Sequence, residues 1–166
     1  MITLIQRMIR AIKLDSELYE EIPVNHSLIF QSIVTIILSS LSAGIAKYPD
    51  DGTTGLILVS VISVFCWILW GYVTFFMANL LLQTNDQSID FMEVIRITGF
   101  ASTPGIIRVL GIFPGFFGIV FFITGIWMLV MMATAMKHAF DMDILRALGV
   151  SAIGGVIQAA IFAIFI

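Results

Sequence analysis

Long runs of apolar residues are the feature that most constrains how this chain of 166 residues can fold. A helix that crosses a bilayer needs about 20 predominantly apolar residues, and four segments reach that length, at about 27–46, 55–82, 115–137 and 147–166. Apolar residues make up 60% of the chain and charged residues only 11%, against roughly 25% charged residues in soluble proteins. So few charges cannot cover a water-facing surface. The sequence therefore predicts an all-α integral membrane protein.

A fifth segment, at about 94–113, is just long enough to cross the bilayer, but it contains Gly99, Pro104 and Arg108. The distribution of lysine and arginine tests whether it does so. With five spans and a cytoplasmic N-terminus, six of the eight cations lie inside and two outside, as the positive-inside rule expects. If the segment only re-entered the membrane, the split would be four against four. We therefore predict a five-span protein of the cell membrane, with its C-terminus outside.

Local signals add detail to this layout. Asp90 and Glu93 have the spacing of a capping box, which predicts a helix start there. Pro104 lacks a backbone donor and restricts Thr103, so a kink is expected near residues 102–103. Polar segments predict short connections at 47–54, 83–93 and 137–146, and a tight turn at 111–115.

The first 14 residues predict a short amphipathic helix that lies on the membrane surface. Isoleucines recur at helical spacing on one side, and Arg7, Arg10 and Lys13 lie on the other. A cationic face of this kind suits contact with the anionic lipids of the cytoplasmic leaflet.

Residues 15–26 predict an acidic cytoplasmic segment before the first span. Its carboxylates are Asp15, Glu17, Glu20 and Glu21, but no glycine supplies the sharp turn of a calcium loop, and we predict no metal site. Leu18, Tyr19 and Ile22 form an apolar edge that could dock on the membrane face or on a partner.

Four polar residues lie inside the apolar runs. Gln31, Asn79 and Gln158 are expected to form hydrogen bonds between helices. Arg108 precedes the end of its segment by only a few residues, so its long stem should reach the outer interface. There we predict a contact with Asp50 or Asp51.

Small residues follow one face of two spans. They are Ser32, Thr35, Ser39 and Ser42 in the first, and Ser151, Gly155, Ala159 and Ala163 in the last. Such stripes let helix backbones approach closely. The contact could lie within the chain, which we favour, or between two copies of it.

Several function classes lack support in the sequence. The net charge of −3 argues against nucleic acid as a partner. No arrangement of nucleophile, base and metal ligands resembles an active site, and no glycine-rich loop could hold a phosphate. We therefore expect neither enzymatic activity nor a cofactor.

Two short motifs within this layout resemble those of a known family. The acidic and aromatic stretch Asp15, Glu17, Leu18, Tyr19, Glu20 precedes the first span, and Gly99, Phe100, Ala101 and Pro104 open the third. With five packed spans and a cytoplasmic N-terminus, the chain resembles the Ypt/Rab-interacting (Yip) family of small polytopic membrane proteins.

The resemblance implies membrane trafficking or membrane shaping, and in eukaryotic members the binding of prenylated Rab-type GTPases at motif residues such as these. This chain has only about 26 residues before its first span, and its acidic stretch continues as Glu20-Glu21 rather than Gly-Pro. Both departures favour a prokaryotic member, and a GTPase partner is expected only for a eukaryotic-type one.

The sequence thus favours a non-enzymatic membrane protein that organises or scaffolds the bilayer, with a homo-oligomer as a possible form. The alternative is a small-solute or lipid transporter or channel that uses the broken third segment, since discontinuous helices are typical of transporters.

Overall fold

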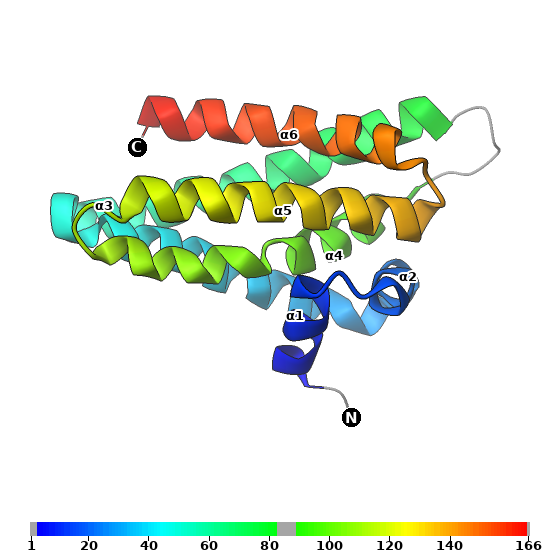
Figure 1. Cartoon of the computed structure of the whole chain (residues 1–166), viewed down its shortest axis with the longest axis horizontal. Coiled ribbons are helices and arrows are strands. Elements are labelled where there is room, and N and C mark those ends of the chain that lie inside the picture. Colours follow the sequence, from blue (N-terminus) through cyan, green and yellow to red (C-terminus); the bar gives the residue numbers. More distant parts are fainter. Residues whose placement is uncertain (1–2, 83–88, 166) are drawn as a thin grey trace.

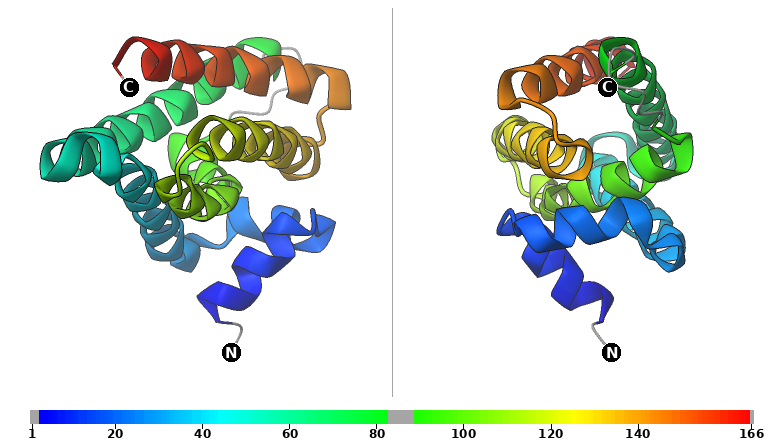
Figure 2. Two further views of the ribbon diagram at one scale, coloured as in Figure 1. Left: turned by 60° about the vertical axis from the view of Figure 1, so that its left-hand side comes forward. Right: turned by 90° about the vertical axis from the view of Figure 1, so that its right-hand side faces the viewer.

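The computed structural model describes residues 3–82 and 89–165, and all of its regular elements are helical. They are α1 (Leu4–Ile12), α2 (Ser16–Val24), η1 (His26–Leu28), α3 (Ile29–Leu82), α4 (Phe91–Ala101), η2 (Thr103–Ile112), α5 (Phe117–Phe140) and α6 (Ile144–Phe165). The long helices run along one axis, whereas α1 and α2 lie crosswise to it on one side of the bundle (Figures 1 and 2). Residues 1–2 of the predicted surface helix, 83–88 of the predicted polar connection and 166 of the last span lie outside the described residues.

Helix α3 consists of two helical arms that meet at Gly52. This glycine has φ 60° and ψ −148°, inside an otherwise helical element, a conformation that glycine adopts without steric cost. The chain reverses direction there, and the two arms diverge from this turn (Figure 2). The predicted connection at 47–54 is therefore too long: helical backbone continues on both sides of Gly52. The ion pairs of Lys47 with Asp50 at 3.4 Å and with Asp51 at 3.7 Å hold this end.

Within residues 3–82 and 89–165, three helices are long and apolar enough to cross a membrane. They are His26–Leu81, which contains both arms of α3, Phe117–Phe140 and Ile144–Ile164, and the helix Thr103–Ile112 is apolar but shorter. The prediction of an all-α membrane protein therefore agrees with the structure at this level.

The third predicted segment is broken where its proline predicts a kink. Helix α4 begins with the expected capping box of Asp90 and Glu93 and ends at Ala101. A 3-10 helix of 10 residues, η2, follows. Pro104 cannot donate to the carbonyl of Phe100, and the Thr103 hydroxyl donates to that oxygen instead, at 2.6 Å. The kink prediction is confirmed.

The first arm of α3 packs closely against α4 and η2, and three glycines permit this. A Cβ on Gly99 would lie 2.6 Å from the Cα of Ser32, and one on Gly105 would lie 1.9 Å from the hydroxyl of Ser39. Farther along, a Cβ on Gly111 would lie 3.0 Å from the Cβ of Ala46. We call this contact the glycine seam. It confirms the internal interpretation of the first small-residue stripe at Ser32 and Ser39.

The stripe on α6 makes a different contact. The indole of Trp70 on α3 donates to the carbonyl of Ser151 at 3.1 Å, and a Cβ on Gly154 would lie 2.0 Å from the Trp70 ring. The closest approach is thus at Gly154, one residue from the predicted Gly155. Ala159 and Ala163, farther along the stripe, are exposed.

The glycine seam yields a stability prediction. In Gly99→Ala the new methyl group meets the backbone of Ser32, which cannot rotate away, so we expect a loss of about 1–3 kcal/mol in stability. The measurement is thermal unfolding in detergent, followed by circular dichroism. Gly118→Ala is the matched control, because a Cβ there meets nothing within 4 Å. Equal melting temperatures for the two variants would contradict the seam.

Candidate functional site

Helix α2 docks on the bundle through the apolar edge that the sequence indicates. Leu18, Tyr19 and Ile22 are all fully buried, in contact with α4 and α5. The Tyr19 hydroxyl donates to the carbonyl of Ala11 at 2.8 Å, which ties α2 to α1. The surface on which this edge docks is therefore the chain's own bundle.

Arg96 on α4 holds the C-terminal end of α2. The side chain is 2% exposed, its Nε donates to the carbonyl of Ile22 at 3.1 Å, and its Nη2 donates to the carbonyl of Pro23. A cation is favourable there because the last carbonyls of a helix lack partners and carry partial negative charge. From sequence, Arg96 bears on topology alone, as one of the six cations placed inside. Arg96 lies more than 70 positions after the two carbonyls that it binds, and the last turn of α2 has no basic residue of its own.

Two of the three predicted surface cations form ion pairs with α2. Arg10 Nε lies 2.6 Å from an oxygen of Asp15, and its Nη2 lies 3.8 Å from one of Glu17. Arg7 lies 3.4 Å from a Glu21 oxygen and donates to the Gln31 side chain at 3.2 Å. Lys13 is exposed. Binding of these cations to anionic lipid stays a prediction.

These contacts shift two pKa values at the end of α1. The hydrogen bond from Arg10 lowers the pKa of Asp15 below its ordinary value, and the same bond raises the pKa of Arg10. Burial raises the pKa of Tyr19, so its hydroxyl stays a donor to Ala11.

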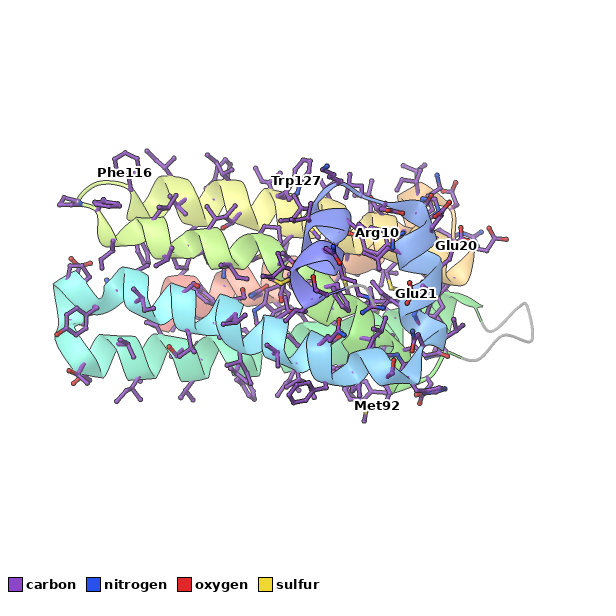
Figure 3. The ribbon with its side chains drawn as sticks, turned by 90° about the horizontal axis from the view of Figure 1, so that it is seen from below. Arg10, Glu20, Glu21, Met92, Phe116 and Trp127 are labelled. Atoms are coloured by element: carbon purple, nitrogen blue, oxygen red, sulfur yellow. The ribbon has the colours of Figure 1, made fainter. Side chains whose placement is uncertain are left out.

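The two family-like motifs therefore divide between packing and surface. Leu18, Tyr19, Phe100 and Ala101 are fully buried, and Pro104 is buried at the start of η2. Glu17 and Glu20 are exposed, and Glu20 lies 3.9 Å from His138 at the end of α5. Arg10, Glu20 and Glu21 lie toward one end of the bundle, with Phe116 at the opposite end (Figure 3). A partner could reach the acidic side chains, but the apolar ones face the core.

The three amides differ in how far they follow the predicted role of hydrogen bonds between helices. Asn79 exchanges hydrogen bonds with the backbone of Ile89, at 3.0 and 3.2 Å, and so ties the end of α3 to the residues before α4. Gln31 on α3 accepts from Arg7 on α1, so its predicted hydrogen bond between helices is confirmed. Gln158 is 8% exposed, and its Nε2 has no hydrogen-bond partner among the described residues.

Arg108 points into the bundle, so the prediction that it contacts Asp50 or Asp51 is wrong. It is 5% exposed; its Nε donates to the hydroxyl of Thr124 at 3.2 Å and its Nη2 lies 3.5 Å from the sulfur of Met128. None of the ion pairs among the described residues includes Arg108. The reason is the 3-10 register: residues three apart share a face, so Arg108 lies in line with the buried glycines of η2.

A cavity of about 390 Å³ lies beside Arg108, between α5, α6 and the second arm of α3. Most of its wall is apolar, and its lining includes Arg108, Gln158, Trp70, Phe121, Gly125 and Phe162. The guanidinium lies 4.7 Å from the ring of Phe121 and 5.7 Å from that of Phe162. No group of three or more metal-ligating side chains occurs in the described part of the chain. The chemistry of this cavity is that of a hydrogen-bond donor and cation in apolar surroundings.

Comparison with known proteins agrees with the resemblance in the sequence. The family model of the Yip1 domain matches residues 15–166. No curated protein and no solved structure matches the chain.

Removal of the Arg96 side chain should release α2. In Arg96→Met, the carbonyls of Ile22 and Pro23 lose their donor inside the core, at a cost of about 1–3 kcal/mol for each unsatisfied group. Hydrogen exchange measured by mass spectrometry should be faster over residues 16–24 than in the unsubstituted protein. Arg146→Met, at an exposed position, controls for loss of charge. Unchanged exchange in Arg96→Met would show that the clamp does not hold α2.

The contact between Arg10 and Asp15 should depend on pH. Because the folded pKa of Asp15 is lowered, its contribution to stability is present above the ordinary pKa of 3.8 and is lost as the pH falls through the folded value. In Arg10→Gln we expect the Asp15 pKa to rise, measured by NMR titration of the carboxyl carbon. Lys13→Gln should leave it unchanged. An unchanged pKa in Arg10→Gln would contradict the assigned cause.

Proposed function

Because the chain belongs to the Yip1 domain family, we propose that it is a non-enzymatic integral membrane protein that organises or scaffolds the bilayer. The observation that carries this proposal is the large apolar surface of its long helices. Side chains such as Phe30, Val61, Phe65, Phe122 and Val156 are 59–72% exposed. Soluble monomers rarely expose contiguous apolar surface on this scale, whereas lipid-facing helices do.

The proposed topology has five spans: the two arms of α3, the pair α4 and η2, α5 and α6. Neither α4 nor η2 is long enough to cross the bilayer alone, so the length of the pair decides whether it can be a span. Eleven α-helical residues at about 1.5 Å each and ten 3-10 residues at about 2.0 Å each reach about 37 Å. A hydrocarbon core is about 30 Å thick. A broken segment of this length is therefore sufficient to cross it.

We place the N-terminus in the cytoplasm and the C-terminus outside the cell membrane, as the distribution of cations favours. In this orientation α1 and α2 lie on the cytoplasmic side. The crosswise direction of α1 (Figure 1) suits a helix in the plane of the leaflet. Ile5 and Ile9 on α1 are exposed and would enter the lipid, with Lys13 near its anionic headgroups.

Protein partners enter this proposal as secondary features. The exposed Ala159 and Ala163 on α6 suit a contact between two copies of the chain, because small residues permit close approach of helices. A GTPase would meet Glu17 and Glu20 if the chain is a eukaryotic-type member. Transport through the broken segment is the weaker alternative, since Ser39 and Met128 fill the space beside Gly105 at the break.

Reconstitution separates organisation of the bilayer from transport. We expect liposomes with anionic lipid to change shape when they contain the protein, as seen by electron microscopy, because α1 inserts into one leaflet only. Release of an entrapped small solute should stay at the level of protein-free liposomes. Solute release that Arg108→Leu abolishes, with liposome shape unchanged by the protein, would defeat the proposal and favour a transporter.

A further inference from the structure

The cavity beside Arg108 contains a buried cation without an anionic partner. A guanidinium has five N–H donors, and Arg108 uses one on a hydroxyl and one on a thioether sulfur, which is a weak acceptor. Its Nη1 has no hydrogen-bond partner among the described residues, although it is buried. An isolated charge in apolar surroundings is costly, so such residues pair with an opposite charge or mark a binding site. The ion pairs of the described residues provide no such charge.

Gln158 adds a second unsatisfied donor to the same cavity. Gln158 is 8% exposed and therefore more than nine-tenths buried. Its Nε2 also lacks a hydrogen-bond partner among the described residues. Buried polar groups in native proteins are nearly always paired. Two unsatisfied donors, one of them charged, in one cavity indicate a ligand that carries an anionic acceptor group.

The rest of the cavity is apolar and elongated. Along α6 its lining runs from Phe162 to Ala152, which is about 15 Å at the α-helical rise. Arg108 lies at the Phe162 end of this stretch, 5.7 Å from that ring, and Gln158 is one helical turn before Phe162. Trp70 and Leu129 lie beside Gly155 in the other part. Phe122 and Val156 belong to both the lining and the exposed surface, each 69% exposed. The cavity therefore reaches the surface that we assign to lipid.

We propose that this cavity binds a single-chain anionic amphiphile. Its carboxylate or phosphate monoester pairs with Arg108 and accepts from Gln158, and its acyl chain lies along α5 and α6. The volume of about 390 Å³ falls within the roughly 300–1,000 Å³ of ligand sites. A small inorganic anion would leave the apolar part of the cavity empty. The proposal rests on the proposed function, because the ligand enters from the bilayer.

The depth of Arg108 suits such a ligand. Ile112, the last residue of η2, follows Arg108 by four positions, which is about 8 Å at the 3-10 rise. The headgroup of an amphiphile anchored at the interface can reach that depth, while its chain continues toward the centre of the bilayer. Arg108 thus binds the headgroup of the ligand and does not extend to the outer membrane interface.

The test is equilibrium binding of tritiated palmitate to the protein in neutral detergent, with hexadecanol as the uncharged probe of equal chain length. We expect at least tenfold tighter binding of palmitate than of hexadecanol. Tritiated lysophosphatidic acid replaces palmitate in a second arm, and the tighter of the two identifies the headgroup. Equal binding of the charged and uncharged probes in both arms would overturn the proposal.

Two variants test the charge and the space separately. Arg108→Gln should abolish the preference for the charged probe, and Gly125→Leu should weaken binding at least tenfold, because Gly125 lines the cavity and a Cβ there meets nothing within 4 Å. Their controls are Arg146→Gln and Gly118→Leu, which change the same residue types outside the cavity. Melting temperatures establish that each variant is folded. Full binding by either folded cavity variant would overturn the assignment.

Failure of this site and failure of the proposed function give different results. If probes do not discriminate by charge while the protein still changes liposome shape, only the site is contradicted. If palmitate binds selectively but liposome shape does not respond to the protein, only the proposed function is contradicted.

Discussion

The glycine seam between the first arm of α3 and the pair α4 and η2 is the contact on which the rest of the structure depends. A bilayer supplies no hydrophobic force between helices, so close backbone approach must come from residues without bulk. Gly99, Gly105 and Gly111 provide it against Ser32, Ser39 and Ala46. The seam also sets the direction of two arginines on the same segment. Arg96, three residues before Gly99, reaches the end of α2, and Arg108, between the other two glycines, faces α5 and the cavity.

Much of the helical layout could be predicted from the sequence, because apolar length and proline act locally. The apolar runs, the capping box at Asp90 and the break at Pro104 are of this kind. The direction of Arg108 could not be predicted, since it depends on period. In an α-helix, positions 105, 108 and 111 would fan around the axis, whereas in a 3-10 helix they form one buried row. No pattern in the sequence predicts a 3-10 helix of 10 residues, because such helices are usually shorter.

The candidate sites were predictable to different extents. The apolar edge of Leu18, Tyr19 and Ile22 was visible as a helical pattern, but its docking surface required the tertiary fold. The cations of α1 were visible as charge, but their pairing with Asp15 and Glu21 depends on the turn between α1 and α2. Arg96 and the cavity partners of Arg108 are distant in sequence from what they contact, so composition and spacing hold no signal for them. One end of the bundle thus combines the ion pairs of α1 and α2 with the buried Arg96, and the other part encloses the Arg108 guanidinium.

The proposed topology depends above all on α4 and η2 crossing the bilayer together as one broken span. The most direct measurement uses single cysteines at Met92 and Phe113, which flank this segment and are both exposed, in a Cys66→Ser background. Membrane-impermeant maleimide is applied to intact cells and to inverted membrane vesicles. If the pair α4 and η2 crosses the bilayer, Phe113→Cys is labelled only in intact cells and Met92→Cys only in inverted vesicles. Labelling of both cysteines from the same side would contradict this topology.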